Sequence, residues 1–317
     1  MTKIAIPKVY SLILSLTQET MRSEAELEEL AAQLEVTGEY RVLRRLRSRT
    51  EFSPDDGSSK KIGIVLDVET TGLDYLRDEI IELAMVKFEY ASDGRIFRIT
   101  DIYNQLREPT IPIPEEVSTL TGITTEKVSG RSIDTADVES FVGDAVIIIA
   151  HNAAFDRKFC EGAWRCFAKK SWACSMNEIA WRGEGFEGSK LGYLLAGIGL
   201  FHDGHRASED CKALIELLSR TLPVSGEAAL RQLLDNARKP TARVWAENSR
   251  YDLKDALKSR GYRWNDGSDG RPRAWWIDVP EEQLEEEEKF LHNQIYGGNF
   301  DFFWTRITAF DRYSVRI

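Results

Sequence analysis

The chain has 317 residues, of which 42% are hydrophobic, and a formal net charge of −10 at pH 7. This composition is typical of a globular protein with one or two domains, and the acidic balance argues against a protein that coats nucleic acid through bulk electrostatics. No apolar run approaches the ~18 residues that span a bilayer, and the N-terminal segment lacks a small-residue cleavage site. The four cysteines lack zinc-site spacing and lie in or beside apolar stretches, as reduced core residues do. The sequence therefore predicts a cytoplasmic protein that makes no contact with a membrane.

Residues 1–50 are predicted to form a helical N-terminal extension. Two groups of apolar residues recur at helical spacing, and they are Leu27, Leu30 and Leu34, followed after Gly38 by Val42, Leu43 and Leu46. Such a stripe could support self-association or a protein partner. Five arginines between Arg41 and Arg49 form either a polar helix face or an arm that binds a partner or a nucleic-acid backbone. Residues 51–60 are rich in helix and strand breakers and predict a linker.

A central domain over residues 61–222 shows mixed helix and strand signals. Strands are predicted at 62–67, 79–90 and 95–103, which would form an antiparallel meander. Residues 145–150 are a valine and isoleucine run without alternation, which predicts a strand covered on both faces. Helical periodicity appears at 153–167 and 207–218. The domain is therefore predicted to be α/β.

A connector over residues 223–240 is followed by a small C-terminal module over 241–317. Strands are predicted near 244–246 and 274–279, with a helix between them and an acidic helix and aromatic-rich tail after them. Lys258, Arg260, Arg263 and Trp264 place cations beside aromatic rings. This composition suits single-stranded nucleic acid, and it equally suits a small domain that builds its core from large aromatic residues.

Three separated motifs of the central domain carry acids and a histidine. Asp67 and Glu69 are two residues apart at the end of a strand, so their side chains can share one face. Asp156 begins a helix, and His205 and Asp210 flank the start of the helix predicted at 207–218. Carboxylates brought together repel one another unless a cation lies among them, and hard oxygen ligands favour Mg²⁺ or Mn²⁺ over zinc. With two such ions, the usual chemistry is phosphodiester hydrolysis.

Other acids close to these motifs, including Glu82 and Glu209, are not expected to be ligands. Glu209 is adjacent to Asp210, so on a helix its side chain points about 100° away.

The order of the motifs resembles a known family. Asp-Val-Glu-Thr-Thr-Gly-Leu at 67–73, His-Asn-Ala-Ala-Phe-Asp at 151–156 and His-x4-Asp at 205–210 resemble the three signatures of DnaQ-like 3′–5′ exonucleases of the DEDDh group. That group includes the proofreading epsilon subunit of bacterial DNA polymerase III. The resemblance covers about residues 61–222 and implies a ribonuclease H-like domain, with a central mixed five-stranded sheet flanked by helices.

The resemblance also implies roles for individual residues. Asp67, Glu69, Asp156 and Asp210 would hold two Mg²⁺ ions, for which Mn²⁺ can substitute, and Asp67 would bridge both. His205 would accept a proton from the attacking water, and nucleoside 5′-monophosphates would be released.

Three further residues resemble, or lie near, substrate positions of the family. Thr70 and Leu73 resemble positions that contact the terminal nucleotide, whereas Phe155 packs either against the substrate or into the core. The expected substrate is DNA, with single strands preferred, in repair, nucleic-acid turnover or defence against foreign DNA. If the protein is an enzyme of another kind, the alternative is an exoribonuclease that trims RNA. An adaptor that uses the nuclease domain as a scaffold for binding protein or nucleic acid is the alternative of another class.

Overall fold

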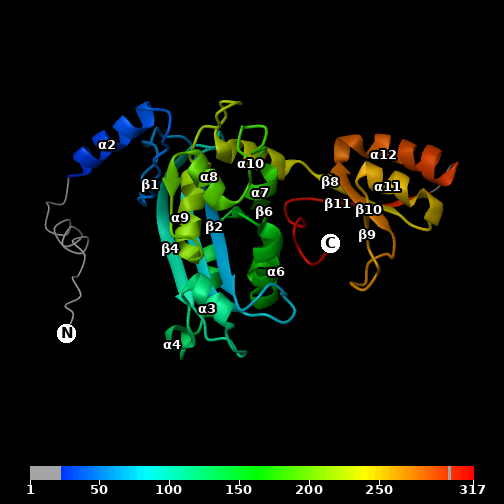
Figure 1. Ribbon diagram of the computed structural model, residues 1–317. Coiled ribbons are helices and arrows are strands. Elements are labelled where there is room, and N and C mark those ends of the chain that lie inside the picture. The colour runs from blue at the N-terminus through cyan, green and yellow to red at the C-terminus, as the bar shows by residue number, and fades with distance from the viewer. Residues whose placement is uncertain (1–22, 299–300) are drawn as a thin grey trace, which may run out of the picture. The chain divides into compact units, whose positions relative to one another are not determined.

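The computed structural model describes residues 23–298 and 301–317, and it divides into two compact units, Met1–Arg45 and Leu46–Ile317 (Figure 1). The first unit contains helix α2 (Glu24–Val36) and the short strand β1 (Arg44–Arg45). Ser23 begins α2 with a reciprocal capping box to Glu26, which satisfies two of the free backbone donors at the helix start. In the part of the chain that the structure describes, no helix has the length and apolar character to cross a membrane.

The helix prediction for residues 1–50 is confirmed only in part. Leu27, Leu30 and Leu34 lie on α2, whereas residues 1–22 lie outside the described residues. Helix α2 ends at Val36 with Thr37 as its C-cap. Gly38 then adopts φ 74°, a left-handed conformation that glycine tolerates and that terminates helices. The prediction that the helical pattern continues beyond Gly38 is therefore wrong.

The central domain of the second unit contains a five-stranded mixed sheet in the order β4-β3-β2-β5-β6, as predicted. Its strands are β2 (Lys61–Thr70), β3 (Ile80–Tyr90), β4 (Ile96–Leu106), β5 (Ile147–Ala150) and β6 (Trp172–Cys174). The pairs β2–β3 and β3–β4 are antiparallel, whereas β2–β5 and β5–β6 are parallel. The predicted meander and the predicted buried strand are thus both present.

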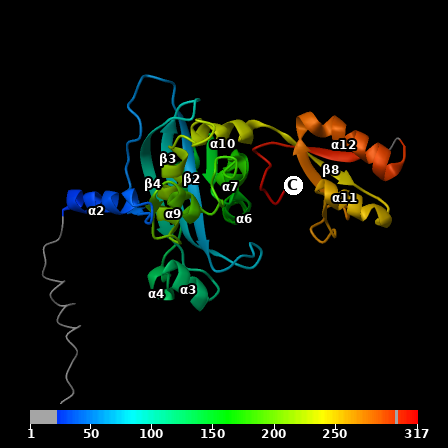
Figure 2. The same cartoon turned by 45° about the horizontal axis from the view of Figure 1, so that its top comes forward.

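Helices cover both faces of this sheet, with α9 lying against β2 and β3 (Figure 2). On one face, Val65 and Val86 pack with apolar residues of α8, α9 and α10. On the other face, Ile64 and Leu66 pack with α5 and α6. Because both faces are covered, these strands read as continuous apolar runs. The remaining elements of the domain are α3 (Glu115–Thr121), α4 (Thr125–Val128), α5 (Thr135–Val142), α6 (Ala153–Ala163), the 3₁₀ helix η1 (Arg165–Lys169), α7 (Ser175–Glu178), α8 (Leu191–Gly197), β7 (Leu200–Phe201), α9 (Ala207–Leu218) and α10 (Ala229–Arg238).

The stretch before β2 lies along the central domain. The backbone N–H of Phe52 donates to the carbonyl of Phe97 at 2.8 Å, and that of Ile99 donates to Thr50 at 2.8 Å. Leu46 and Phe52 also pack against the core. Part of the breaker-rich segment at 51–60 is therefore held against β4.

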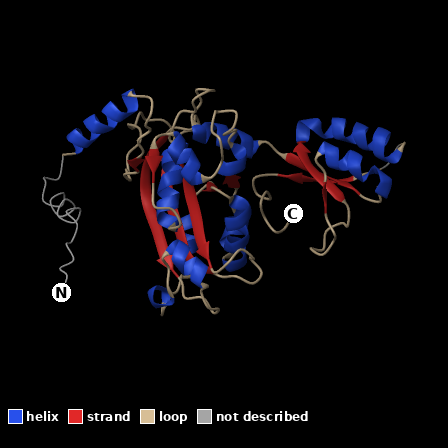
Figure 3. Cartoon of the chain, in the orientation of Figure 1, coloured by secondary structure: helices blue, strands red, loops and turns tan. Residues whose placement is uncertain are grey.

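The C-terminal module has its own antiparallel sheet in the order β11-β8-β10-β9, with its helices on one face (Figure 3). Val244, Leu257 and Phe290 are among the buried residues of its separate core. Its strands are β8 (Thr241–Ala246), β9 (Arg263–Trp264), β10 (Trp275–Pro280) and β11 (Phe303–Ile307). Its helical segments are η2 (Tyr251–Leu253), α11 (Lys254–Arg260), η3 (Glu281–Gln283), α12 (Leu284–Phe290) and the π-helical turn η4 (Leu291–Tyr296).

The residues after β11 return to the central domain. The fully buried guanidinium of Arg157 on α6 donates to the carbonyls of Arg312 and Phe310, both at 2.6 Å. The N–H of Trp172 donates to the carbonyl of Ala309 at 2.8 Å, at the outer edge of β6. A buried charge is tolerated only when it is paired or hydrogen-bonded. Glu161 pairs with the Nε of Arg157 at 2.7 Å, and the tail carbonyls satisfy its other two nitrogens. The module is consequently joined to the central domain at both of its ends.

Candidate active site

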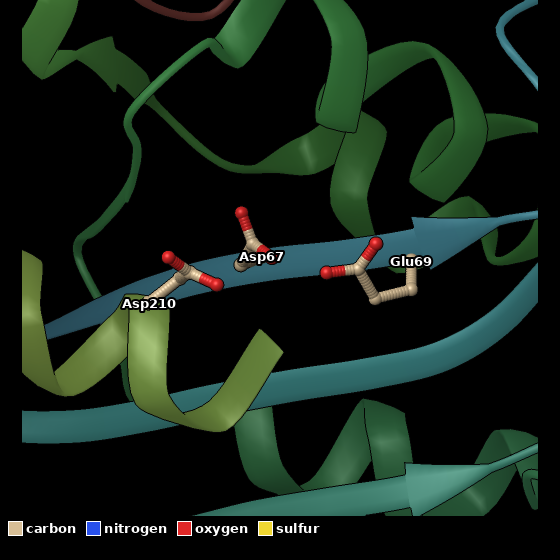
Figure 4. A group of neighbouring side chains, drawn as sticks. All are labelled: Asp67, Glu69 and Asp210. Carbon is tan, nitrogen blue, oxygen red and sulfur yellow. The ribbon is translucent and has the colours of Figure 1, made fainter. Parts of the chain in front are cut away.

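Three acids converge at the surface of the central sheet. Asp67 and Glu69 project from β2 and Asp210 from α9, and one carboxylate oxygen of each lies within 4.8 Å of those of the other two (Figure 4). Alternate residues of a strand share a face, so Asp67 and Glu69 point in the same direction. Asp210 joins them because α9 packs on that face of β2 and β3. Figure 4 shows the three carboxylates turned toward one another.

Asp156 reaches β2 from a different helix. Strand β2 pairs with β5 only from Gly63 to Val65, so the two strands separate before the end of β2. Helix α6 starts three residues after β5, and the buried Asp156 carboxylate accepts a hydrogen bond from the Val68 N–H at 3.1 Å. The fourth acid is thus fixed to the same strand segment, although it lies outside the group of three.

Burial, helped by neighbouring carboxylates at Asp67 and Glu69, disfavours the charged form of three of these acids. Burial, followed by the charge of Asp156, raises the pKa of Asp67 well above its usual range. Burial, followed by the charge of Asp210, raises the pKa of Glu69 to about 8. Burial also raises the pKa of Asp156 to about 7. Such a site holds its full negative charge at neutral pH only with a cation among the oxygens, and an all-oxygen donor set fits a hard divalent ion.

The loop before α9 carries two histidines. His205 is exposed and adopts φ 65°, a conformation uncommon outside glycine. His202, which the sequence analysis missed, contacts Asp210, with its Nε2 2.7 Å from Oδ1. The Arg206 N–H donates to the other oxygen of Asp210 at 3.1 Å. Both oxygens of Asp210 are therefore oriented by this loop.

Glu82 holds the same loop from behind. It is fully buried on β3 and accepts hydrogen bonds from Arg206 Nη2 at 3.1 Å and from the Ala207 N–H at 3.3 Å. The three acids that come within 4.8 Å of one another do not include it. Its contacts instead tie the start of α9 to the sheet. A charged residue inside the apolar run of β3 is the sequence signal that could have revealed such a role.

The predicted substrate-contact residues lie at the end of β2 and on α6. Thr70 is buried, and its hydroxyl donates to the carbonyl of Gly72 at 2.5 Å. A Cβ at Gly72 would come within 2.5 Å of the Asp78 carboxylate, so a larger residue here would displace that side chain. Leu73 is 86% exposed on the following loop. Phe155 is half-buried and packs at the edge of the core.

The four C-terminal residues that were predicted to contact nucleic acid differ in their surroundings. Arg260 Nε donates to the buried Glu287 carboxylate at 2.8 Å, and its guanidinium lies over a ring of the module's core, 4.5 Å from the centroid. Arg260 is therefore bound within the module. Lys258, Arg263 and Trp264 are exposed.

The mixed sheet and its group of acids define a ribonuclease H-like hydrolase domain with a site for a divalent metal ion. Residues 64–218 match the RNase_T family of exonucleases. The chain therefore carries a DnaQ-like exonuclease domain, and this domain together with the acidic cluster implies dependence on a divalent metal ion.

Relatives in sequence and structure are also exonucleases or polymerases. The chain is 42% identical over 110 residues to a PolC-type DNA polymerase III of Thermotoga petrophila, which is 34% of this chain and 8% of that protein. The PolC-type polymerase of Clostridium perfringens is 32% identical over 162 residues, or 49% of this chain and 11% of that protein. The chain thus spans only a small part of these relatives. Exonuclease X, solved with 5′ overhanging duplex DNA, is 26% identical with a TM-score of 0.42, covering 55% of this chain and 98% of that one.

Proposed function

We propose that the chain is a 3′–5′ exonuclease that hydrolyses phosphodiester bonds from the 3′ end of DNA, prefers single strands and releases nucleoside 5′-monophosphates. The observation that carries the proposal is the convergence of Asp67, Glu69 and Asp210 within 4.8 Å, with Asp156 bound to the same strand segment. The order of these acids along the chain matches the DEDDh arrangement.

The carboxylates provide places for two ions, for which Mg²⁺ is the proposed metal. Asp67, Glu69 and Asp210 would hold one ion, and Asp156 together with Asp67 would hold the second. A pair of divalent ions stabilises the entering and leaving oxygens of a phosphodiester displacement.

His205 is the proposed general base. It is exposed on the loop beside Asp210, and an imidazole can accept a proton near neutral pH. His202 is hydrogen-bonded to Asp210 and would instead orient that carboxylate. Leu73, exposed on the loop after β2, would pack beside the terminal nucleotide, next to the backbone of Thr70.

A digestion panel tests the substrate. End-labelled single- and double-stranded DNA and RNA of one sequence would be incubated with Mg²⁺, beside the Asp210→Ala variant as the inactive control. The proposal predicts fastest shortening of single-stranded DNA. Faster shortening of RNA would instead establish an exoribonuclease.

The proposal also distinguishes an enzyme from an adaptor. Asp67→Ala removes a ligand but leaves the surfaces of the N-terminal extension and the C-terminal module intact. A nuclease acting in repair, turnover or defence loses its biological effect with this substitution, whereas a scaffold retains it.

Self-association through α2 belongs to the same proposal. Leu27, Leu30 and Leu34 are 54%, 37% and 42% exposed, and their spacing places them on neighbouring turns of the helix. An exposed apolar stripe of this kind suits a second copy of the helix or a helical partner.

A further inference from the structure

One side of the C-terminal module combines exposed aromatic rings with lysines. Tyr251, Lys254 and Lys258 are three and four residues apart on η2 and α11, so they lie along one side of the helix. Tyr251 is 80% exposed, and Lys258 is exposed as well. Lys254 Nζ donates to the Tyr251 hydroxyl at 2.9 Å and lies 4.2 Å from the centroid of its ring.

This row continues onto the edge of the module's sheet. Trp264 on β9 pairs in register with Trp275 on β10, and their ring centroids are 5.6 Å apart. Lys258 Nζ lies 5.8 Å from the Trp275 ring, so it connects the helix to the two tryptophans. Trp264 is 50% exposed. Tyr251, Lys254, Lys258 and Trp264 are called the basic–aromatic strip below.

The positive charges of the strip are not neutralised by acids. Within the described residues, neither Lys254 nor Lys258 forms an ion pair with a carboxylate. By contrast, Arg260 on the same helix pairs with Glu286 and Glu287 of α12 at 3.0 and 2.8 Å. Glu286 and Glu287 are thus engaged by Arg260, and the strip presents two lysine ammonium groups that have no carboxylate partner in the part of the chain that the structure describes.

The aromatic residues of the strip are not required for the module's core. Tyr262 and Leu257 are buried in that core, so other residues already supply the large apolar side chains that a small domain needs. Tyr251 and Trp264 leave most or half of their surface exposed. Exposed rings beside lysines without a carboxylate partner are complementary to bases and phosphates, because every base has a π-face on which a ring can stack.

We infer that the basic–aromatic strip binds a single-stranded segment of the nucleic-acid substrate, with Lys254 and Lys258 contacting phosphates and Tyr251 and Trp264 stacking on bases. The ligand class rests on the proposed function. The tail that returns to Arg157 keeps the module attached to the exonuclease domain at both ends, so a strand bound at the strip stays close to the enzyme.

Binding is tested separately from hydrolysis. In an Asp210→Asn background, anisotropy of a labelled twenty-nucleotide oligothymidylate and of its ribo-counterpart would be measured over a series of salt concentrations. Lys254→Gln with Lys258→Gln should lower the slope of log affinity against log salt by about 1.4, since each phosphate contact on a single strand contributes about 0.7. Tyr251→Ala with Trp264→Ala should weaken binding at least tenfold, because stacking contributes about 1–3 kcal/mol per base.

The matched control is Lys289→Gln, since Lys289 is an exposed lysine of the same module that pairs with Glu285 at 2.6 Å. It should leave affinity and salt slope unchanged. With Asp210 intact, both double variants should hydrolyse a trinucleotide at the wild-type rate. Thermal melting verifies that each variant is folded. If the aromatic variant is unfolded, the lysine variant alone tests whether the strip binds nucleic acid.

The outcomes separate the two proposals. Affinity within twofold of wild type in the folded lysine variant, with its salt slope unchanged, would overturn the strip as a binding site. Loss of binding in a protein that degrades none of the panel substrates would uphold the strip and overturn the nuclease.

Discussion

Replacing Glu69 by glutamine should stabilise the metal-free protein. Burial and the charge of Asp210 raise the pKa of Glu69 from 4.5 to about 8 in the folded state. Because the folded pKa lies above the unfolded one, ionisation favours the unfolded chain. The resulting destabilisation begins above pH 4.5 and is complete above pH 8. Each pKa unit corresponds to ~1.4 kcal/mol. The free energy of unfolding is therefore lowered by about 1 kcal/mol at pH 5 and by about 5 kcal/mol above pH 8.

The assay is thermal unfolding in the presence of a chelator at pH 5 and pH 8.5. Glu69→Gln should raise the Tm by about 5–10 °C at pH 8.5 and by only a degree or two at pH 5. Glu89→Gln is the matched control on the neighbouring strand, because the Glu89 carboxylate is paired with Arg98 at 2.9 Å and lies away from the acids. It should not raise the Tm at either pH. Added Mg²⁺ should stabilise the wild type more than Glu69→Gln.

Two results would refute this reasoning. An equal gain at both pH values would mean that the glutamine acts through packing and not through charge. A lower Tm for metal-free Glu69→Gln at pH 8.5 would mean that the acids do not repel one another in the folded protein.

Three further predictions concern other parts of the chain. His205→Gln should lower kcat by about 10²–10⁴-fold at saturating Mg²⁺. A kcat within a factor of about two of wild type would exclude His205 as the base. Arg157→Met should lower the free energy of unfolding by about 3 kcal/mol or more in urea, because buried carbonyls of the tail lose their donors; a loss below about 1 kcal/mol would contradict the role of the tail. Light scattering should show wild type larger than one chain and Leu30→Asp as a monomer, and a monomeric wild type would exclude self-association through α2.

The central strands could be predicted because each is signalled by a run of neighbouring apolar residues in the sequence. The 145–150 run reads as a strand covered on both faces, and β5 is covered on both. Asp67 and Glu69 were predictable for the same reason, since the two-residue period of a strand determines their common face.

Other features depend on contacts between distant residues. Glu82 binds Arg206 across 124 positions, and Arg157 binds tail residues more than 150 positions away. The periodicity of residues within a single helix or strand cannot predict such pairings. The Arg260 prediction drew on composition alone, which could not show that Glu287 already occupies the guanidinium. His202 was missed because a histidine eight residues before Asp210 forms no recognisable spacing with it.

The polarity of cleavage by the metal-bound site tests the central claim most directly. Single-stranded DNA labelled at its 5′ end would be digested with Mg²⁺ by wild type, Asp210→Asn and Glu209→Gln. Glu209 is the matched control, because it neighbours Asp210 in sequence but pairs with Lys212 at 2.7 Å. The expected result is a ladder that shortens one nucleotide at a time from the 3′ end with wild type and Glu209→Gln, and none with Asp210→Asn or with chelator. Immediate release of a labelled mononucleotide, or a ladder that persists in Asp210→Asn, would contradict the account.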